Sequence, residues 1–249
     1  MSDDTFRAHL VWDGPTRWFH WINFLAVIGL MGVGLVILNG KALGISNEGK
    51  VLLKTLHVWV GYALVLNLTW RLVWAFIGNR YARWSAFLPL GPGYFSAIRA
   101  YVSSFFTGHR RMYLGHNPLG RIAVTVLLLL LLSQAVTGLV LAGTDLFYPP
   151  FGHWIAQWIA APGVDPSALV PYAKEMMDES AYETMRAFRE PFVTLHELGF
   201  YGLLVIVVLH IAGVVTAELR EGGSLVSAMF TGKKILTGPP EDNDVTRED

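Results

Sequence analysis

The chain has 249 residues, of which only 15% are charged and 53% are hydrophobic, and its formal net charge is zero. A soluble globular protein usually carries about a quarter of charged residues, so this composition indicates that lipid is the main solvent. The sequence contains no cysteine, which excludes disulfides, thiolate zinc sites, iron–sulfur clusters and covalently attached c-type haem on this chain. The neutral total charge gives no argument for nucleic acid as a partner.

Four apolar runs are long enough to cross a bilayer, which needs roughly 20 apolar residues in a helix. They cover residues 18–38, 56–77, 119–142 and 192–217. Asn117-Pro118 stands before the third run and Pro191 before the fourth, as is typical of residues that start a helix. We therefore expect an all-α fold, an integral membrane four-helix bundle in which residues 1–249 form a single membrane domain.

The distribution of arginine and lysine predicts the orientation of the bundle. Segment 78–118 holds five arginines and no acidic residue, so it should be cytoplasmic. Loop 143–190 is acidic on balance and should face the periplasm. Four spans then place both termini in the cytoplasm, with residues 218–249 as a cytoplasmic tail, although three lysines in the first outer loop favour the opposite orientation. Those lysines are Lys41, Lys50 and Lys54. We expect a multi-pass protein of the bacterial inner membrane.

Two further segments have the pattern of amphipathic helices outside the spans. Residues 171–188 in the outer loop could lie on the membrane surface or serve as a docking surface for a partner. Residues 90–106 carry one apolar stripe and are predicted to lie along the inner interface.

Four histidines lie within the predicted spans, where ionisable groups are costly and therefore usually functional. His196 and His210 are fourteen residues apart, which places them within roughly 40° of one helix face and about 21 Å apart along the axis. With the termini inside, His57 lies at the level of His196, and His20 lies nearer the level of His210. The pairs His57–His196 and His20–His210 would each bind one six-coordinate haem iron, an arrangement suited to electron transfer.

Other interpretations of the four histidines are open. A zinc site would need about four ligands at one depth, whereas these cluster at two. The histidines could instead be unrelated and bonded to backbone carbonyls, or form a proton relay, for which Glu197 is the one clear carboxylate in the spans. Glycines near the ligands, such as Gly34 and Gly138, leave room for a flat macrocycle or simply allow close helix packing.

Basic and polar residues near the cytoplasmic ends of the spans are further candidates. Arg17, Arg71 and Arg121 could pair with haem propionates or anchor the helices at lipid headgroups, and Arg17 and Arg71 are favoured because they are closest in depth to the inner haem. His116 and Asn117 precede the third span at that depth, and both can hydrogen-bond a quinone carbonyl. The alternative is that Asn117 only caps the helix.

Several motifs resemble the family of membrane cytochromes b that includes the membrane subunit of nickel–iron hydrogenases and, more distantly, that of formate dehydrogenase. The motifs are Val11-Trp12-Asp13-Gly14-Pro15-Thr16-Arg17-Trp18-Phe19-His20-Trp21, Leu56-His57 with Gly61-Tyr62, Arg71-Leu72-Val73-Trp74-Ala75-Phe76-Ile77-Gly78, Gly115-His116-Asn117-Pro118-Leu119 and His196-Glu197-Leu198-Gly199. They cover most of residues 11–220, and the first is the most specific.

The resemblance implies a subunit with two haem b groups that passes electrons between a periplasmic redox partner and the membrane quinone pool. The long acidic loop from Phe151 to Arg189 and the tail after Arg220 depart from the family pattern. They leave the partner open among a hydrogenase, another molybdenum or iron–sulfur oxidoreductase, and a soluble c-type cytochrome. Two other functions compete: a self-contained haem oxidoreductase that couples quinone to a small oxidant such as superoxide, and a cofactor-free transporter or assembly factor.

Overall fold

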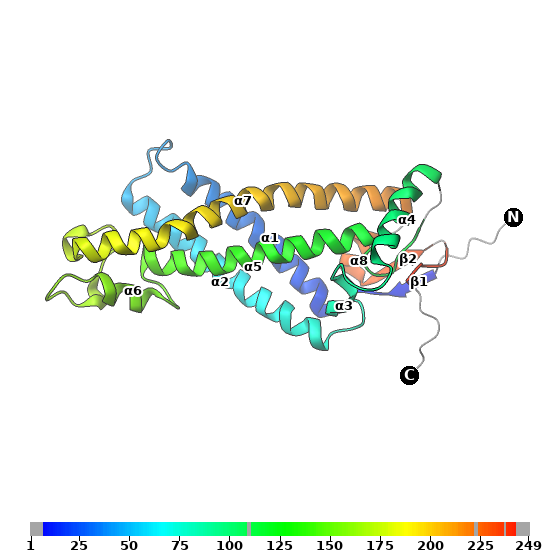
Figure 1. Ribbon diagram of the computed structural model, residues 1–249, viewed down its shortest axis with the longest axis horizontal. Coiled ribbons are helices and arrows are strands. Elements are labelled where there is room, and N and C mark those ends of the chain that lie inside the picture. Colours follow the sequence, from blue (N-terminus) through cyan, green and yellow to red (C-terminus); the bar gives the residue numbers. More distant parts are fainter. Residues whose placement is uncertain (1–6, 109–110, 222–223, 237, 243–249) are drawn as a thin grey trace. The chain divides into compact units, whose positions relative to one another are not determined.

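The computed structural model describes residues 7–108, 111–221, 224–236 and 238–242. Four long helices dominate it (Figure 1): α1 (Gly14–Leu38), α2 (Asn47–Ile77), α5 (Pro118–Leu146) and α7 (Glu179–Glu221). Each is long and apolar enough to cross a membrane. The prediction of an all-α chain with four spans is confirmed, and the chain is a multi-pass membrane protein.

Helix α7 begins well before the predicted fourth span. It runs from Glu179 through Pro191, which the sequence analysis took as the point where the helix starts. Proline in a helix interior removes one backbone hydrogen bond, but membrane helices tolerate it where the freed carbonyl finds another donor. Residues 179–188 are helical, as predicted, but they belong to α7 and do not form a separate helix. Residues 171–178 contain turns and a short 3₁₀ helix but no α-helix, so the predicted start of a helix at residue 171 is wrong.

The chain forms two compact units, and every long helix contributes to both. Unit 1 comprises Met1–Trp21, Leu68–Leu129 and Leu204–Asp249, and unit 2 comprises Ile22–Asn67 and Leu130–Leu203. His20 and His210 belong to unit 1, whereas His57 and His196 belong to unit 2. Each predicted histidine pair is therefore contained within one unit.

Unit 1 also contains short helices and strands outside the four long helices. They are β1 (Arg7–Leu10), α3 (Trp84–Phe87), α4 (Tyr94–Thr107), α8 (Leu225–Thr231) and β2 (Lys233–Leu236). Strands β1 and β2 pair antiparallel, with Arg7 opposite Leu236 and Leu10 opposite Lys233. This two-stranded ribbon was not predicted from the sequence. Of the predicted tail 218–249, residues 222–223, 237 and 243–249 lie outside the described part.

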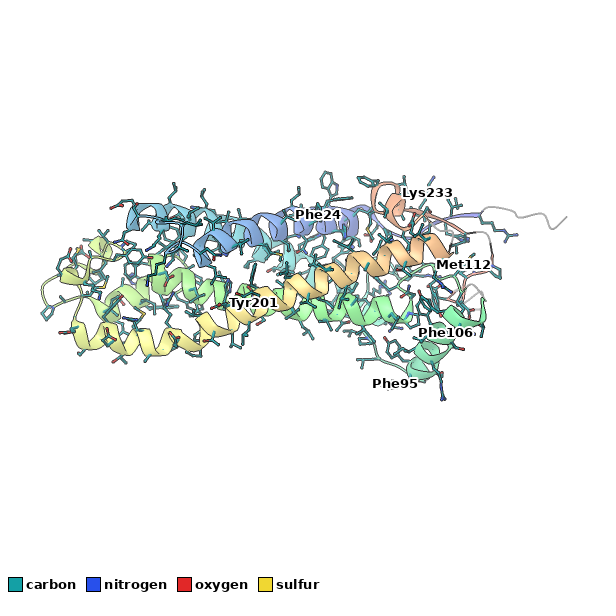
Figure 2. All side chains as sticks on the ribbon, turned by 90° about the horizontal axis from the view of Figure 1, so that it is seen from above. Phe24, Phe95, Phe106, Met112, Tyr201 and Lys233 are labelled. Carbon is teal, nitrogen blue, oxygen red and sulfur yellow. The ribbon has the colours of Figure 1, made fainter. Side chains whose placement is uncertain are left out.

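Helix α4 has one buried and one strongly exposed face. Tyr94, Tyr101 and Ser104 are buried, whereas Phe95 and Phe106 are 84% and 86% exposed and project outward (Figure 2). Exposed aromatic side chains on a short helix are what a helix lying along a membrane surface requires. The helix occupies most of the segment 90–106 for which the sequence predicts this role.

In unit 2, the long loop between α5 and α7 is packed rather than extended. It contains α6 (Gly152–Ile159) and two short 3₁₀ helices, η1 (Pro166–Ala168) and η2 (Lys174–Met176). Apolar side chains of α6, of the loop and of the start of α7 share a core: Ile155, Ala156, Ile159, Leu169, Met177 and Met185. The Tyr62 hydroxyl on α2 donates a hydrogen bond of 2.5 Å to the Pro149 carbonyl, which fixes the start of the loop to the bundle.

Candidate functional site

His57 on α2 and His196 on α7 lie opposite each other in unit 2. Their ring centres are 6.2 Å apart and the ring planes are inclined at 70°. A metal–imidazole bond of about 2.0 Å on each side places the centres of two axial imidazoles roughly 6 Å apart. The spacing therefore fits one iron atom bound between the two rings.

A cavity of about 430 Å³ is lined by both histidines. Its volume lies within the usual range of small-molecule and cofactor pockets. Two glycines keep the wall open: an added Cβ on Gly34 would lie 3.4 Å from Cε1 of His57, and one on Gly138 would lie 3.4 Å from Cε1 of His196. A larger side chain at either glycine would crowd the imidazole beside it, so these residues fit a flat macrocycle.

The hydroxyl of Thr137 on α5 sets the tautomer of His196. Its Oγ1 lies 2.8 Å from Nδ1 of His196 and donates its hydrogen to the Ser133 carbonyl, also at 2.8 Å. With its one hydrogen directed at the Ser133 carbonyl, the hydroxyl accepts from Nδ1–H of His196. Nε2 of His196 then carries a free lone pair, which is the form that ligates iron, and the second nitrogen is held as in other metal sites.

The side chain of Gln134 positions the helix that carries His196. Its Nε2 donates a 2.9 Å hydrogen bond to the backbone carbonyl of His196. A Cβ on Gly199 would lie 2.0 Å from that nitrogen, so the amide occupies the space left by this glycine. Gln134 and Thr137 were not predicted as site residues, although polar residues inside the apolar run 119–142 could have indicated them.

His20 on α1 and His210 on α7, the second predicted pair, both belong to unit 1. The two imidazoles are close enough to interact electrostatically. Nδ1 of His20 is buried and has no hydrogen-bond partner among the described residues. The centres of the His20 and Trp21 rings are 5.5 Å apart, and the two ring planes are nearly perpendicular. A buried imidazole nitrogen without a partner is costly, and an additional bound group would relieve that cost.

Arg71 and Arg17 also carry buried nitrogens without partners. Arg71 is 7% exposed, its guanidinium lies 4.6 Å from the centre of the Phe87 ring, and its Nη1 bonds to no described residue. Nε of Arg17 is likewise buried and unpartnered, while its Nη1 donates to the Phe230 carbonyl. The Asp13 carboxylate interacts electrostatically with Arg71, but the unpartnered nitrogens of Arg71 and Arg17 can still donate to the carboxylate of a haem side chain.

Arg121 has a different role. Its Nη2 donates to the Ser85 carbonyl at 2.9 Å and also to the Leu88 carbonyl. These contacts hold the region around α3 against the start of α5. Nη2 of Arg121 is thus engaged with the protein backbone, whereas its Nε, like that of Arg17, is buried without a partner among the described residues.

Asn117 is occupied by contacts within unit 1. Its Oδ1 accepts a 2.7 Å hydrogen bond from the Gly120 backbone, and its Nδ2 donates at 2.8 Å to the Tyr101 hydroxyl. The first contact is that of a helix N-cap, which typically stabilises by about 1 kcal/mol. Asn117 therefore holds the start of α5 and the adjacent α4 in place.

His116 lies beside it in a different environment. Its ring packs against Trp12 at 5.0 Å, and its Nδ1 is buried without a partner among the described residues. Burial, with help from the nearby Lys234 and Arg71 cations, lowers the pKa of His116 to about 3. The imidazole is therefore neutral at physiological pH and has an unused ring nitrogen.

Comparison with known proteins identifies the family. Residues 11–232 match the family described as prokaryotic cytochrome b561, so the chain belongs to it. A probable Ni/Fe-hydrogenase B-type cytochrome subunit of Bradyrhizobium diazoefficiens is 27% identical over 90% of this chain and 85% of its own length. The similarly named subunit of Cupriavidus necator is 23% identical over 94% and 90%. The probable Ni/Fe-hydrogenase 1 B-type cytochrome subunit of Escherichia coli is 30% identical over 57% and 63%.

The family confirms the resemblance found in the motifs. It makes the chain a membrane electron-transfer protein, similar to hydrogenase cytochrome b subunits, and implies haem b as its cofactor.

Proposed function

We propose that this cytochrome b561-family protein binds two haem b groups and passes electrons across the membrane between a periplasmic redox partner and the quinone pool. The observation that carries the proposal is the facing pair of imidazoles, His57 and His196, beside a cavity of about 430 Å³. Haem b supplies a one-electron carrier that alternates between ferric and ferrous iron.

The residues around each proposed haem would determine whether its iron can bind a further ligand. His57 and His196 would hold one haem iron between them, and with two imidazole ligands this iron would carry electrons without binding oxygen or substrate. Thr137 keeps His196 in the ligating tautomer. In unit 1, His20 and His210 would hold the second haem, and Arg71 and Arg17 would receive its carboxylates.

The charge distribution supports an orientation in the membrane. The pairing of β1 with β2 brings residues 7–10 and 233–236 together, which is what an even number of spans would produce. The arginine-rich segment 78–118 lies in unit 1, and the acidic loop 143–190 lies in unit 2. We place the former in the cytoplasm and the latter in the periplasm of a bacterial inner membrane, in accord with the positive-inside rule.

Quinone would bind beside the inner haem, with His116 as its main contact. The neutral imidazole has a buried nitrogen without a partner that can hydrogen-bond a quinone carbonyl. The amide of Asn117 already contacts Gly120 and Tyr101, so it would shape the site through the start of α5. The imidazole offers a hydrogen bond but no proton, because with a pKa of about 3 it is not protonated near neutral pH.

The periplasmic partner is inferred from the relatives, whose names assign them to Ni/Fe hydrogenases. A hydrogenase or a related oxidoreductase fits, and a soluble c-type cytochrome could deliver electrons to the same face. The packed loop of α6, η1 and η2 would form the docking surface.

Purification from native membranes tests the proposal. We expect a Soret band, two haem b per chain by the pyridine haemochrome assay, and co-purification of a periplasmic redox subunit. A colourless protein would contradict any cytochrome function. A ratio of one haem per chain would contradict the second site.

A further inference from the structure

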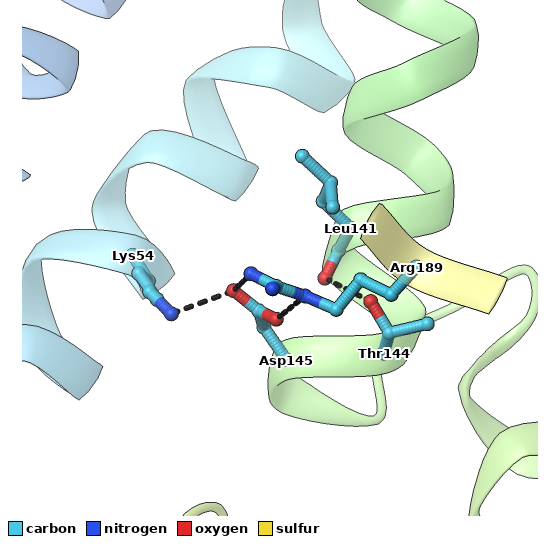
Figure 3. Close-up of polar contacts among 5 residues, drawn as sticks. All are labelled: Lys54, Leu141, Thr144, Asp145 and Arg189. Carbon is cyan, nitrogen blue, oxygen red and sulfur yellow. Dashed lines mark hydrogen bonds and ion pairs between the residues drawn. The ribbon is translucent and has the colours of Figure 1, made fainter. Parts of the chain in front are cut away.

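Three charged side chains from three helices meet at the cavity of unit 2 (Figure 3). Nζ of Lys54 on α2 lies 2.6 Å from Oδ2 of Asp145 on α5. Arg189 on α7 contacts the same carboxylate through Nε at 2.6 Å and Nη2 at 3.1 Å. All three residues line the cavity that is also lined by His57 and His196.

This group carries one more positive than negative charge. A clamp that only joins helices needs one cation for one carboxylate, whereas Asp145 has two. The side chains are 22%, 14% and 26% exposed for Lys54, Asp145 and Arg189. The remaining charged residues that line the cavity, Lys50 and Glu197, cancel in number, so the cavity has a net charge of plus one. A partly buried excess charge is costly without a counter-ion.

We propose that Lys54 and Arg189 bind a propionate of the haem held by His57 and His196, and that Asp145 fixes the two cations in position. This inference rests on the proposed function. The bidentate contact uses Nε and Nη2 of Arg189, and its Nη1 has no hydrogen bond to a described residue. Ammonium and guanidinium groups form their strongest hydrogen bonds with carboxylates. The ring of Tyr172, 5.4 Å from Nζ of Lys54, covers the site.

Charge substitutions separate a propionate site from a structural clamp. A nearby positive charge favours ferrous over ferric haem, because the ferrous form carries one positive charge fewer. Lys54→Met and Arg189→Gln should therefore lower the midpoint potential of this haem, and Asp145→Asn should raise it. Opposite signs would show that these three charges act on the haem of unit 2, whereas a shift of all three variants in the same direction would show that packing alone changes the potential and would overturn the proposal.

Two other basic residues of unit 2 provide matched controls, one on α7 and one in the connection between α1 and α2. Arg186 on α7 is exposed, pairs with Glu183 at 3.7 Å and does not line the cavity. Arg186→Gln and Lys41→Met should leave both haem potentials unchanged. The potential of the haem in unit 1 serves as an internal reference in every variant and shows that the bundle has folded.

Haem dimethyl ester, which lacks free carboxylates, gives the deciding measurement. Full-length apoprotein reconstituted with this haem should show a much smaller difference in potential between wild type and Arg189→Gln than protein with haem b. An equal difference with both haems would overturn the propionate contact. Equal haem content in wild type and His57→Ala would instead overturn the proposed function, because no haem would then depend on the pair.

Discussion

Nδ1 of His196 and the hydroxyl of Thr137 lie 2.8 Å apart, and this hydrogen bond leaves Nε2 as the ring nitrogen available to a ligand. The bond also makes the imidazole a stronger donor to the metal, since a hydrogen-bonded Nδ1–H raises ligand basicity. Thr137 is itself 4% exposed, so water cannot replace its hydroxyl.

Removal of this bond should change the haem without removing it. Thr137→Val keeps the shape of the side chain but lacks the hydroxyl, so His196 becomes a weaker donor and ferrous iron is relatively favoured. We expect a higher midpoint potential for the haem of unit 2 and an unchanged potential for the other, measured by redox titration.

Two variants control for this experiment. Thr137→Ser retains the hydroxyl and should restore the wild-type potential. Thr144→Val removes a buried hydroxyl on the same helix whose one hydrogen bond among the described residues is to the Leu141 carbonyl, and it should have no effect. A shift as large in Thr144→Val as in Thr137→Val would show that the potential responds to packing alone.

The four histidines should act as two pairs. Since His57 and His196 lie in unit 2, replacing either with Ala should remove one haem and leave the other. His20→Ala or His210→Ala should remove the opposite haem. The pyridine haemochrome assay should give about one haem per chain for each variant, with different remaining potentials for the two groups. A variant that keeps both haems would break the pairing.

The orientation can be tested with reporters. A reporter inserted near Arg99 in α4 should behave as cytoplasmic, and one near Glu179 at the start of α7 should behave as periplasmic, because arginine-rich segments stay inside. Alkaline phosphatase and green fluorescent protein fusions report the two sides in complementary ways. The reverse labelling would exchange the inner and outer haems.

Quinone turnover should depend more on His116 than on Asn117. His116→Phe keeps a ring against Trp12 but loses the hydrogen-bonding nitrogens, so we expect at least a tenfold loss of quinone reduction, which corresponds to about 1.4 kcal/mol, with both haems intact. Asn117→Ser keeps a cap for α5 and should retain most of the activity. Unchanged turnover in His116→Phe would place quinone elsewhere.

Much of the fold was predictable because lipid imposes a simple rule on length and polarity. The four spans followed from that rule, and the histidines stood out because ionisable groups are rare in apolar runs. The start of α7 was not predictable, since Pro191 is a helix-starting signal in isolation and only its neighbours keep the helix continuous. The β1–β2 ribbon was also beyond reach, because it joins residues more than two hundred positions apart.

Lys54 shows why charge patterns alone mislead. Counted as a loop lysine, it argued against the orientation that the arginines favour. In the structure it is part of α2 and pairs with Asp145 at 2.6 Å, so its charge is partly neutralised. The partner of a side chain cannot be read from the sequence when it lies on another helix. The same reason explains why Thr137 and Arg189 escaped notice as candidate site residues.

The ribbon of β1 and β2 also constrains the order in which the protein is made. Strand β1 leaves the ribosome first, and its partner, residues 233–236, emerges only after the fourth span has been synthesised. The core of Val11 and Trp12 against Ala228 and Leu236 cannot close before then. His20 is ten residues beyond β1, so the surroundings of this histidine in unit 1 are complete only after β2 has been synthesised.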